Sequence, residues 1–272
     1  MRDKPIGFMD SGLGGLSVLQ EVQKLLPRED FEYFADNYRQ PYGEKSQGEL
    51  IDFTKQIISF LLNKGIKLCV IACNTATAAS LEVVRKEFSI PILGVIQSAV
   101  QEAVEKTTNK RIGIIATEYT TRSQIYPQEI KKIDPQIKIF DNFCPRFVSL
   151  VEEGKFHHPD TYLIAKKYLH PLQEARVDTL ILGCTHYSFL KEIIASIMGP
   201  EVRIIDPAES TAQTLKELLR QKNFCKEKGL SRENYYTTGS PQKVEMIARI
   251  ILRRNIKIRK IDLTELELIR KT

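Results

Sequence analysis

Two cysteines stand where two predicted strands end, and this placement makes them the first candidates for chemistry. Residues 68–75 read LCVIACNT and residues 179–186 read TLILGCTH, so Cys73 and Cys184 each follow an apolar strand and precede polar residues that open a helix. A helix N-terminus offers unpaired backbone N–H groups and the positive end of the helix dipole. Both features lower the pKa of a thiol, so we expect Cys73 and Cys184 to be reactive.

The remaining three of the five cysteines lack such a context. Cys69 lies four residues before Cys73 on the same predicted strand, roughly 13 Å away, which is too far for a disulfide or a shared metal. We expect Cys69 to be an inert core residue, and nothing polar supports Cys144 or Cys225. An odd cysteine count in a long chain does not indicate a disulfide framework. Reduced thiols, and hence a cytoplasmic location, are the prediction.

A pair of thiols that faces one carbon from opposite sides is suited to inverting a stereocentre. One thiolate removes the proton and the opposing thiol donates another to the other face. The ordinary thiol pKa of about 8.5 lies near working pH, so small shifts adjust it. A zinc site would need clustered ligands, but the Cys184-x-His186 pair is isolated and the other histidines follow no metal spacing. No metal is therefore expected.

Short apolar runs alternate with helical patterns along the chain, which predicts a mostly parallel sheet with helices on both faces. The predicted strands span Ile6–Asp10, Phe31–Ala35, Leu68–Cys73, Ile92–Ile96, Arg111–Ala116, Ile137–Phe140, Thr179–Cys184 and Val202–Asp206. The predicted helices include Gly15–Leu26, Gln47–Asn63, Thr75–Phe88, Thr161–Glu174 and Tyr187–Met198. Further helix and strand material follows in Tyr235–Gly239, Val244–Arg254 and Ile256–Ile261.

The chain also repeats itself. Ile6–Asp10 (IGFMD) matches Ile112–Ala116 (IGIIA), and the two cysteine segments recur in the same order at a similar spacing. Any two parallel strands resemble each other, but the shared order favours a duplicated α/β half. In open α/β sheets ligands bind beyond the carboxyl ends of the strands, where the polar clusters after these strands lie.

A glycine-rich loop, residues 10–15 (DSGLGG), follows the first predicted strand. Together with Asp36 at the end of the second strand it resembles the opening of a dinucleotide-binding unit. The third glycine of that motif is missing because position 17 is Ser, and Asp10 places a carboxylate where pyrophosphate would sit. Asp10 is better suited to an ammonium group or to organising a thiol, and a nucleotide stays open as the alternative.

Composition excludes several other classes. The net charge is +6, and residues 241–272 carry nine Lys/Arg against four Asp/Glu with no aromatic residue. A nucleic-acid binder would show a basic face with interleaved aromatics, so solvated surface is the prediction and nucleic acid is not expected as a partner. No apolar run approaches the roughly 18–20 residues of a membrane span. The N-terminus MRDKPIGFMDSG has no pattern typical of an export signal.

At these residues the sequence resembles glutamate racemases, within the cofactor-independent aspartate/glutamate racemase superfamily. The matching stretches are GFMDSGLGGLSVL (7–19), FADNYRQPYGEKS (34–46), VIACNTATAA (70–79), FVSLVEEG (147–154), ILGCTHY (181–187) and IDPAES (205–210). The resemblance implies an α/β fold of two pseudo-symmetric doubly wound domains, with the active site in the interdomain cleft. It places residues 1–97 and 209–272 in the first domain and 98–208 in the second.

The resemblance also implies roles for individual residues. Cys73 and Cys184 look like the two catalytic acid/bases, Asp10 and His186 resemble their polar partners, and Glu152 resembles a third assisting carboxylate. Glu152 is almost equally well explained as a solvated carboxylate at a helix end. Eight positions match those that hold the amino acid: Asp10, Ser11, Tyr42, Gly43, Asn74, Thr75, Thr185 and His186.

The implied activity is interconversion of L- and D-glutamate without pyridoxal phosphate, metal or nucleotide. The implied role is supply of D-glutamate for peptidoglycan by a homodimer. A racemase acting on aspartate, a nucleic-acid-associated protein and an NAD-dependent oxidoreductase are the alternatives. Ser149 and Ser188 stand where proline is expected in much of the family, and Met9 replaces a common aromatic.

Overall fold

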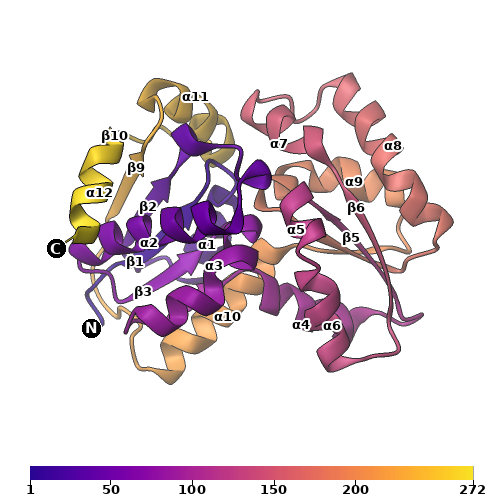
Figure 1. The fold of residues 1–272 in the computed structure, drawn as a ribbon, viewed down its shortest axis with the longest axis horizontal. Coiled ribbons are helices and arrows are strands. Elements are labelled where there is room, and N and C mark those ends of the chain that lie inside the picture. Colours follow the sequence, from indigo (N-terminus) through magenta and orange to yellow (C-terminus); the bar gives the residue numbers. More distant parts are fainter. Residues whose placement is uncertain (272) are drawn as a thin grey trace.

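The computed structural model, which describes residues 1–271, contains two parallel β-sheets that lie side by side (Figure 1). The first sheet has the strand order β10-β9-β2-β1-β3-β4 and the second has the order β6-β5-β7-β8. The strands of the first sheet are β1 (Ile6–Asp10), β2 (Phe31–Ala35), β3 (Leu68–Ile71), β4 (Ile92–Gly94), β9 (Glu233–Thr237) and β10 (Ile258–Lys260). Those of the second are β5 (Arg111–Ala116), β6 (Lys138–Phe143), β7 (Thr179–Gly183) and β8 (Arg203–Ile205).

The central strands form because most of their residues are apolar on both faces. Every residue of β1, β2, β3 and β7 is buried. Parallel strands covered by helices on both sides need such continuous apolar runs, in contrast to the alternating pattern of half-exposed strands. The α/β class predicted from the sequence is therefore confirmed.

The two sheets repeat one topology. The order β2-β1-β3-β4 of the first corresponds to β6-β5-β7-β8 of the second, and all these pairs are parallel. Strand β1 thus corresponds to β5, as the match of Ile6–Asp10 with Ile112–Ala116 predicted. Strand β3 corresponds to β7, so Cys73 and Cys184 follow equivalent strands of two related halves.

Helices cover both faces of each sheet. The first sheet packs against α1 (Leu16–Leu25), α10 (Pro207–Gln221) and α11 (Pro241–Leu252) on one face, and against α2 (Gln47–Asn63), α3 (Asn74–Glu87) and α12 (Leu263–Lys271) on the other. The second sheet packs against α7 (Pro145–Glu152), α8 (Pro159–Glu174) and α9 (Lys191–Met198) on one face, and against α4 (Ile96–Lys106) and α6 (Ile125–Ile133) on the other. The short helix α5 (Glu118–Arg122) follows β5.

Helices α4 and α10 exchange places between the halves. Helix α4 follows β4 of the first sheet, yet its buried residues share a core with Ile112 and Ile181 of the second. Helix α10 follows β8 of the second sheet, yet it lies beside the first half (Figure 1), and its leucines share a core with α1 and the first sheet. The sequence-based prediction included neither helix. Placing domain boundaries near residues 97 and 208 stays a prediction, which this exchange supports.

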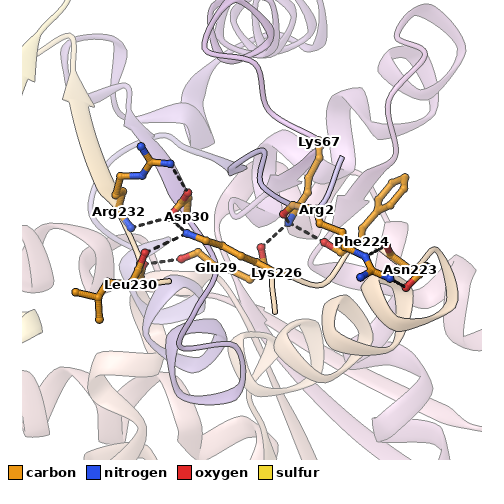
Figure 2. A network of polar contacts seen from close by, with 10 residues as sticks. Arg2, Glu29, Asp30, Lys67, Asn223, Phe224, Lys226, Leu230 and Arg232 are labelled. Atoms are coloured by element: carbon orange, nitrogen blue, oxygen red, sulfur yellow. Dashed lines mark hydrogen bonds and ion pairs between the residues drawn. The ribbon is translucent and has the colours of Figure 1, made fainter. Parts of the chain in front are cut away.

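The C-terminal segment returns to the first sheet, where β9 pairs with β2 and β10 with β9. A polar network at the amino ends of β1, β2 and β3 fastens it (Figure 2). There Lys67 and Glu29 form an ion pair with side chains 0% and 2% exposed. Lys67 Nζ also donates to the carbonyls of Arg2 and Phe224, both at 2.9 Å. Lys226 extends the network through its ion pair with Asp30 at 2.7 Å.

Several predicted boundaries differ from the structure. The predicted strands Leu68–Cys73 and Thr179–Cys184 end one or two residues earlier, because each cysteine caps the following helix. The predicted helix Tyr187–Met198 is a 3-10 helix over Thr185–Leu190 followed by α9. Within residues 1–271, no helix combines the length and the apolar character that a bilayer crossing requires.

Candidate active site

Cys73 and Cys184 line one cavity of about 90 Å³ between the two halves. Its first-half lining comprises Ser11, Gln40, Pro41, Tyr42, Gly43, Glu44, Cys73, Asn74 and Thr75. Its second-half lining comprises Thr117, Glu118, Cys144, Pro145, Val148, Cys184, Thr185 and His186. Both thiol-bearing residues are 6% exposed. Seven of the eight residues that the resemblance assigns to substrate binding lie in this lining, and Asp10 lies outside it.

Cys73 occupies the N-cap of α3. Its Sγ accepts a hydrogen bond from the backbone N–H of Ala76 at 3.5 Å and contacts Ser11 Oγ at 3.7 Å. Burial nevertheless raises the pKa of Cys73 to about 12, and the charge of Asp10 adds to this rise. The expected lowering of this thiol pKa is therefore wrong, because desolvation outweighs the helix N-terminus.

Asp10 lies behind this thiol, at the end of β1, and is fully buried. Its Oδ2 accepts the backbone N–H of Gly12 at 2.9 Å, while Oδ1 has no hydrogen-bond partner. Burial raises the pKa of Asp10, although the charge of His186 opposes the rise. Since Asp10 is outside the cavity lining, the geometry favours its predicted role beside Cys73 over contact with a ligand ammonium.

Cys184 contacts a histidine, and that histidine in turn contacts a carboxylate. His186 Nδ1 lies 3.7 Å from Cys184 Sγ, and His186 Nε2 lies 2.8 Å from Glu152 Oε1. Burial disfavours the charged ring, but the hydrogen bonds and charges of Cys184 and Glu152 raise the pKa of His186 well above its ordinary value. The arrangement can hold a proton next to Cys184 Sγ.

Glu152 is only 22% exposed in its side chain, so the reading of a solvated helix-end carboxylate is wrong. Its Oε1 also accepts from Gln40 Nε2 at 3.2 Å and from the backbone N–H of Leu13 at 3.3 Å. Burial opposes ionisation, but the bond from His186, with help from Gln40 and Leu13, lowers the pKa of Glu152. The carboxylate therefore stays charged.

Asn74 and Thr75 open α3 and contact the second half directly. Asn74 Nδ2 donates to the hydroxyl of Tyr126 at 2.6 Å, which leaves Asn74 Oδ1 buried without a partner. Thr75 Oγ1 lies 2.9 Å from Thr117 Oγ1. These contacts fix two polar side chains of the first half at the cavity wall.

Tyr42 and Gly43 form another edge of the cavity, called the lip below. The Tyr42 hydroxyl donates to Asp36, which also accepts from Arg39 and Thr238, so this hydroxyl is already engaged. Gly43 approaches the second half so closely that an added Cβ would come within 3.3 Å of Thr117. The lip is a fixed turn with little room for a side chain at Gly43.

The glycine-rich loop allows side chains of the second half to lie close to the backbone of the first. A side chain at Gly12 would collide with Gln40 and Glu152, and one at Gly14 would collide with His186 and Thr185. Protein groups therefore occupy the space where a dinucleotide motif would hold pyrophosphate. The Asp36 carboxylate is fully buried and already accepts three hydrogen bonds from protein groups, so it is not available to bind a ribose hydroxyl. These observations argue against the nucleotide alternative.

Sequence reasoning missed several residues of the site. Gln40, Thr117 and Val148 line the cavity, and the buried Tyr126 positions Asn74. Gln40 stands beside the PYG motif, which is the signal that could have found it. Cys144 lines the cavity although it had no supporting context. Cys69 is buried as predicted, and burial raises its pKa to about 12.

The two serines that depart from the family pattern lie apart from the cavity lining. Ser149 Oγ donates to the Arg146 carbonyl within α7 at 3.0 Å. Ser188 Oγ donates at 2.7 Å to Asp206, the residue that caps α10. Neither removes a polar group from the cavity. Among the described residues, no group of three or more His, Cys, Asp or Glu is placed to hold a metal.

Comparison with known proteins decides the family. The model of the Asp/Glu/hydantoin racemase family matches residues 6–215. The chain is 47% identical to a glutamate racemase of Geobacter metallireducens over 217 residues, which is 80% of each protein. It is 40% identical to one of Streptococcus sanguinis over 97% of this chain and the whole of the relative. The chain belongs to the Asp/Glu/hydantoin racemase family. The resemblance seen in the motifs is thereby confirmed, and the chain is an isomerase of the racemase type.

Solved structures agree with this membership. A glutamate racemase of Bacillus anthracis superposes with a TM-score of 0.94 at 36% identity, covering 97% of this chain and 99% of that one. One of Francisella tularensis in complex with D-glutamate gives 0.89 at 33%, covering 97% and 98%. An aspartate racemase homologue of Pyrococcus horikoshii gives 0.59 at 16% over 80% of this chain and 99% of its own, so it shares the fold alone.

Proposed function

We propose that the chain is a glutamate racemase that uses Cys73 and Cys184 as two opposed acid/bases. The observation that carries this proposal is that two thiols from equivalent strands of related halves line one cavity. A substrate carbon held between them is open to one sulfur on each face. Removal of a proton by one and delivery by the other inverts the centre.

The cavity favours a small dicarboxylate amino acid. Its volume of about 90 Å³ is far below the roughly 300–1,000 Å³ of pockets for drug-sized ligands. Helix α3 and the 3-10 helix at Thr185 both begin at the cavity, and helix N-termini attract anions. Two such ends suit two carboxylates. The four relatives reported at 33–47% identity bear the name glutamate racemase, which favours glutamate over aspartate.

Proton transfer follows from the two surroundings. The Sγ of one cysteine takes the α-proton, leaving a carbanion whose charge spreads into the adjacent carboxylate. The S–H of the other cysteine then delivers its proton to the opposite face, and the roles reverse in the other direction. Asp10 and Ser11 act on Cys73, whereas His186 and Glu152 act on Cys184.

Purified protein incubated with L-glutamate and no added cofactor tests the activity. The circular-dichroism signal of L-glutamate should decay to zero, while that of L-aspartate should persist. Decay with aspartate but not with glutamate would overturn the substrate assignment. Loss of activity on removing nicotinamide nucleotides or metals would contradict a cofactor-free reaction.

Isotope labelling tests the two-base mechanism. In deuterium oxide, the D-glutamate formed first from L-glutamate should carry deuterium at the α carbon, while unreacted L-glutamate stays largely protiated. With two separate bases, the proton delivered to the product differs from the proton removed from the substrate. A base that protonates the substrate again returns the proton that it has just removed. Equal early labelling of both enantiomers, or an unlabelled product, would contradict opposed roles for Cys73 and Cys184.

The physiological part of the proposal rests on expectations from the sequence. It comprises supply of D-glutamate for peptidoglycan, a cytoplasmic location and a homodimer. Rescue of a bacterial strain that requires D-glutamate tests the first, and analytical ultracentrifugation tests the last. Failure to restore growth of that strain would contradict the first, and a monomer at working concentration would contradict the last.

A further inference from the structure

The carboxylate of Glu152 bridges the two halves. Glu152 ends α7 of the second half, and its Oε1 contacts His186 of the same half at 2.8 Å. The other two hydrogen bonds to this oxygen come from the first half, from Gln40 Nε2 at 3.2 Å and the N–H of Leu13 at 3.3 Å. The position of Glu152 therefore depends on residues across the cleft.

The two thiols differ in this respect. The hydrogen-bond partners of Cys73 Sγ, namely Ser11 and Ala76, both come from the first half. The groups behind Cys184 are His186 and then Glu152, which the first half completes. Among the described residues, the hydrogen-bonded chain behind Cys184 is thus assembled across the cleft, whereas the direct hydrogen bonds of Cys73 stay within one half.

Gln40 is built to donate toward Glu152. Its Oε1 accepts from Asn37 Nδ2 at 3.3 Å, which turns its Nε2 to the carboxylate. Gly12 lies directly beneath this amide, since any side chain there would overlap it. A donor facing a buried carboxylate stabilises the charged form.

We propose that Gln40 is a positioning residue, which holds the Glu152 carboxylate toward His186 and thereby tunes proton transfer at Cys184. The inference rests on the proposed racemase function and deepens it. Gln40 acts through Glu152 and His186 and does not exchange protons with the substrate.

An effect confined to one thiol has a particular kinetic signature. The two enantiomers have equal free energy in water, so kcat/KM must fall by the same factor in both directions. The asymmetry appears in the deuterium isotope effect instead. When proton removal by Cys184 slows, cleavage of the C–H bond limits the rate more strongly in that one direction.

The experiment compares Gln40→Leu, which removes the donor, with Gln40→Glu, which sets a second carboxylate against Glu152. Rates are measured with L- and D-glutamate, protiated and α-deuterated. Both variants should lower kcat/KM about threefold to tenfold, as expected for one lost hydrogen bond. The isotope effect on kcat/KM should rise in one direction only, the same direction in which it rises for His186→Asn. The matched control is Gln47→Leu, whose amide donates to the Ala79 carbonyl outside the cavity lining, and it should change neither quantity.

A second measurement does not depend on the substrate. The imidazole nitrogen signals of His186, assigned by their loss in His186→Asn, should shift in both Gln40 variants and stay fixed in Gln47→Leu. If these signals shift while wild-type protein leaves glutamate unchanged, the proposed function fails and the positioning contact stands. Unchanged signals with unchanged isotope effects would overturn the inference. An equal rise of the isotope effect in both directions would overturn it too, because that pattern indicates general loosening of the site.

Discussion

Replacing Glu152 by glutamine tests the polar chain behind Cys184 most directly. The hydrogen bond between His186 Nε2 and Glu152 Oε1 spans 2.8 Å in a buried setting. Bonds to charged groups contribute about 1.5–3 kcal/mol, and a neutral acceptor keeps roughly half of that. The loss of about 0.8–1.5 kcal/mol in the transition state corresponds to a fall in kcat/KM of about 4-fold to 13-fold.

The same substitution should move a pKa in a defined direction. The hydrogen bonds and charges of Cys184 and Glu152 hold the pKa of His186 well above 6.5, against the effect of burial. Without the Glu152 carboxylate, burial weighs more and the pKa of His186 should fall, so the imidazolium is lost at lower pH. NMR titration of the ring nitrogens measures this shift, and a polarimetric assay measures kcat/KM.

Glu153→Gln is the matched control, because Glu153 is half-exposed and pairs with Lys155 on the surface at 2.6 Å. An exposed pair contributes at most about 1 kcal/mol to stability and none of it reaches the cavity, so kcat/KM should stay within about twofold of wild type. The reasoning would be refuted if Glu152→Gln also kept kcat/KM within about twofold and left the His186 titration unchanged.

Three further outcomes are expected. Cys73→Ala and Cys184→Ala should each lower kcat by at least about 100-fold to 10,000-fold, the range of acid/base catalysis, whereas Cys225→Ala should retain activity in the polarimetric assay. The pH profile of kcat should be bell-shaped, and because burial raises the pKa of Cys73 to about 12 its rising limb should extend to alkaline pH; a flat profile in protein shown to stay folded would contradict this. Lys67→Met should lower Tm by about 5–9 °C, from about 3–5 kcal/mol for a broken buried pair and an unfolding entropy of about 2.1 cal/mol/K per residue, whereas Lys24→Met at an exposed pair should change Tm by less than about 2 °C in calorimetry.

The core of the fold was accessible from sequence because buried parallel strands leave a strong signal. Ile6–Asp10, Phe31–Ala35 and Arg111–Ala116 were predicted with the observed ends, since each is a short apolar run bounded by polar residues. The exchange of α4 and α10 was not predictable in this way, because each helix follows a strand of one half and packs on the other. An amphipathic pattern reports that a face is buried and says nothing of the sheet that buries it.

In the site too, features set by neighbouring residues were predicted, whereas features set by residues distant in the sequence were not. The cysteines and the polar residues after them were found because the motif is contiguous. The burial of Glu152 was not predicted, because its partners Leu13 and Gln40 lie more than a hundred residues away in the chain. The raised pKa of Cys73 was missed for a related reason. Desolvation depends on the whole surrounding core, whereas the helix N-terminus that favoured a low value is visible locally.

The exchange of α4 and α10 sets an order for folding during synthesis. Every element of the second half, from α4 through β8, lies in one continuous stretch between residues 96 and 205. Synthesis of the first half starts earlier, but β2 has no neighbouring strand on one side until β9 leaves the ribosome. Helix α1 likewise has no α10 to pack against until that helix has been synthesised. An unpaired strand edge is a site for aggregation. The half whose synthesis begins first is thus the last to close, and the β2 edge stays unpaired until β9 emerges.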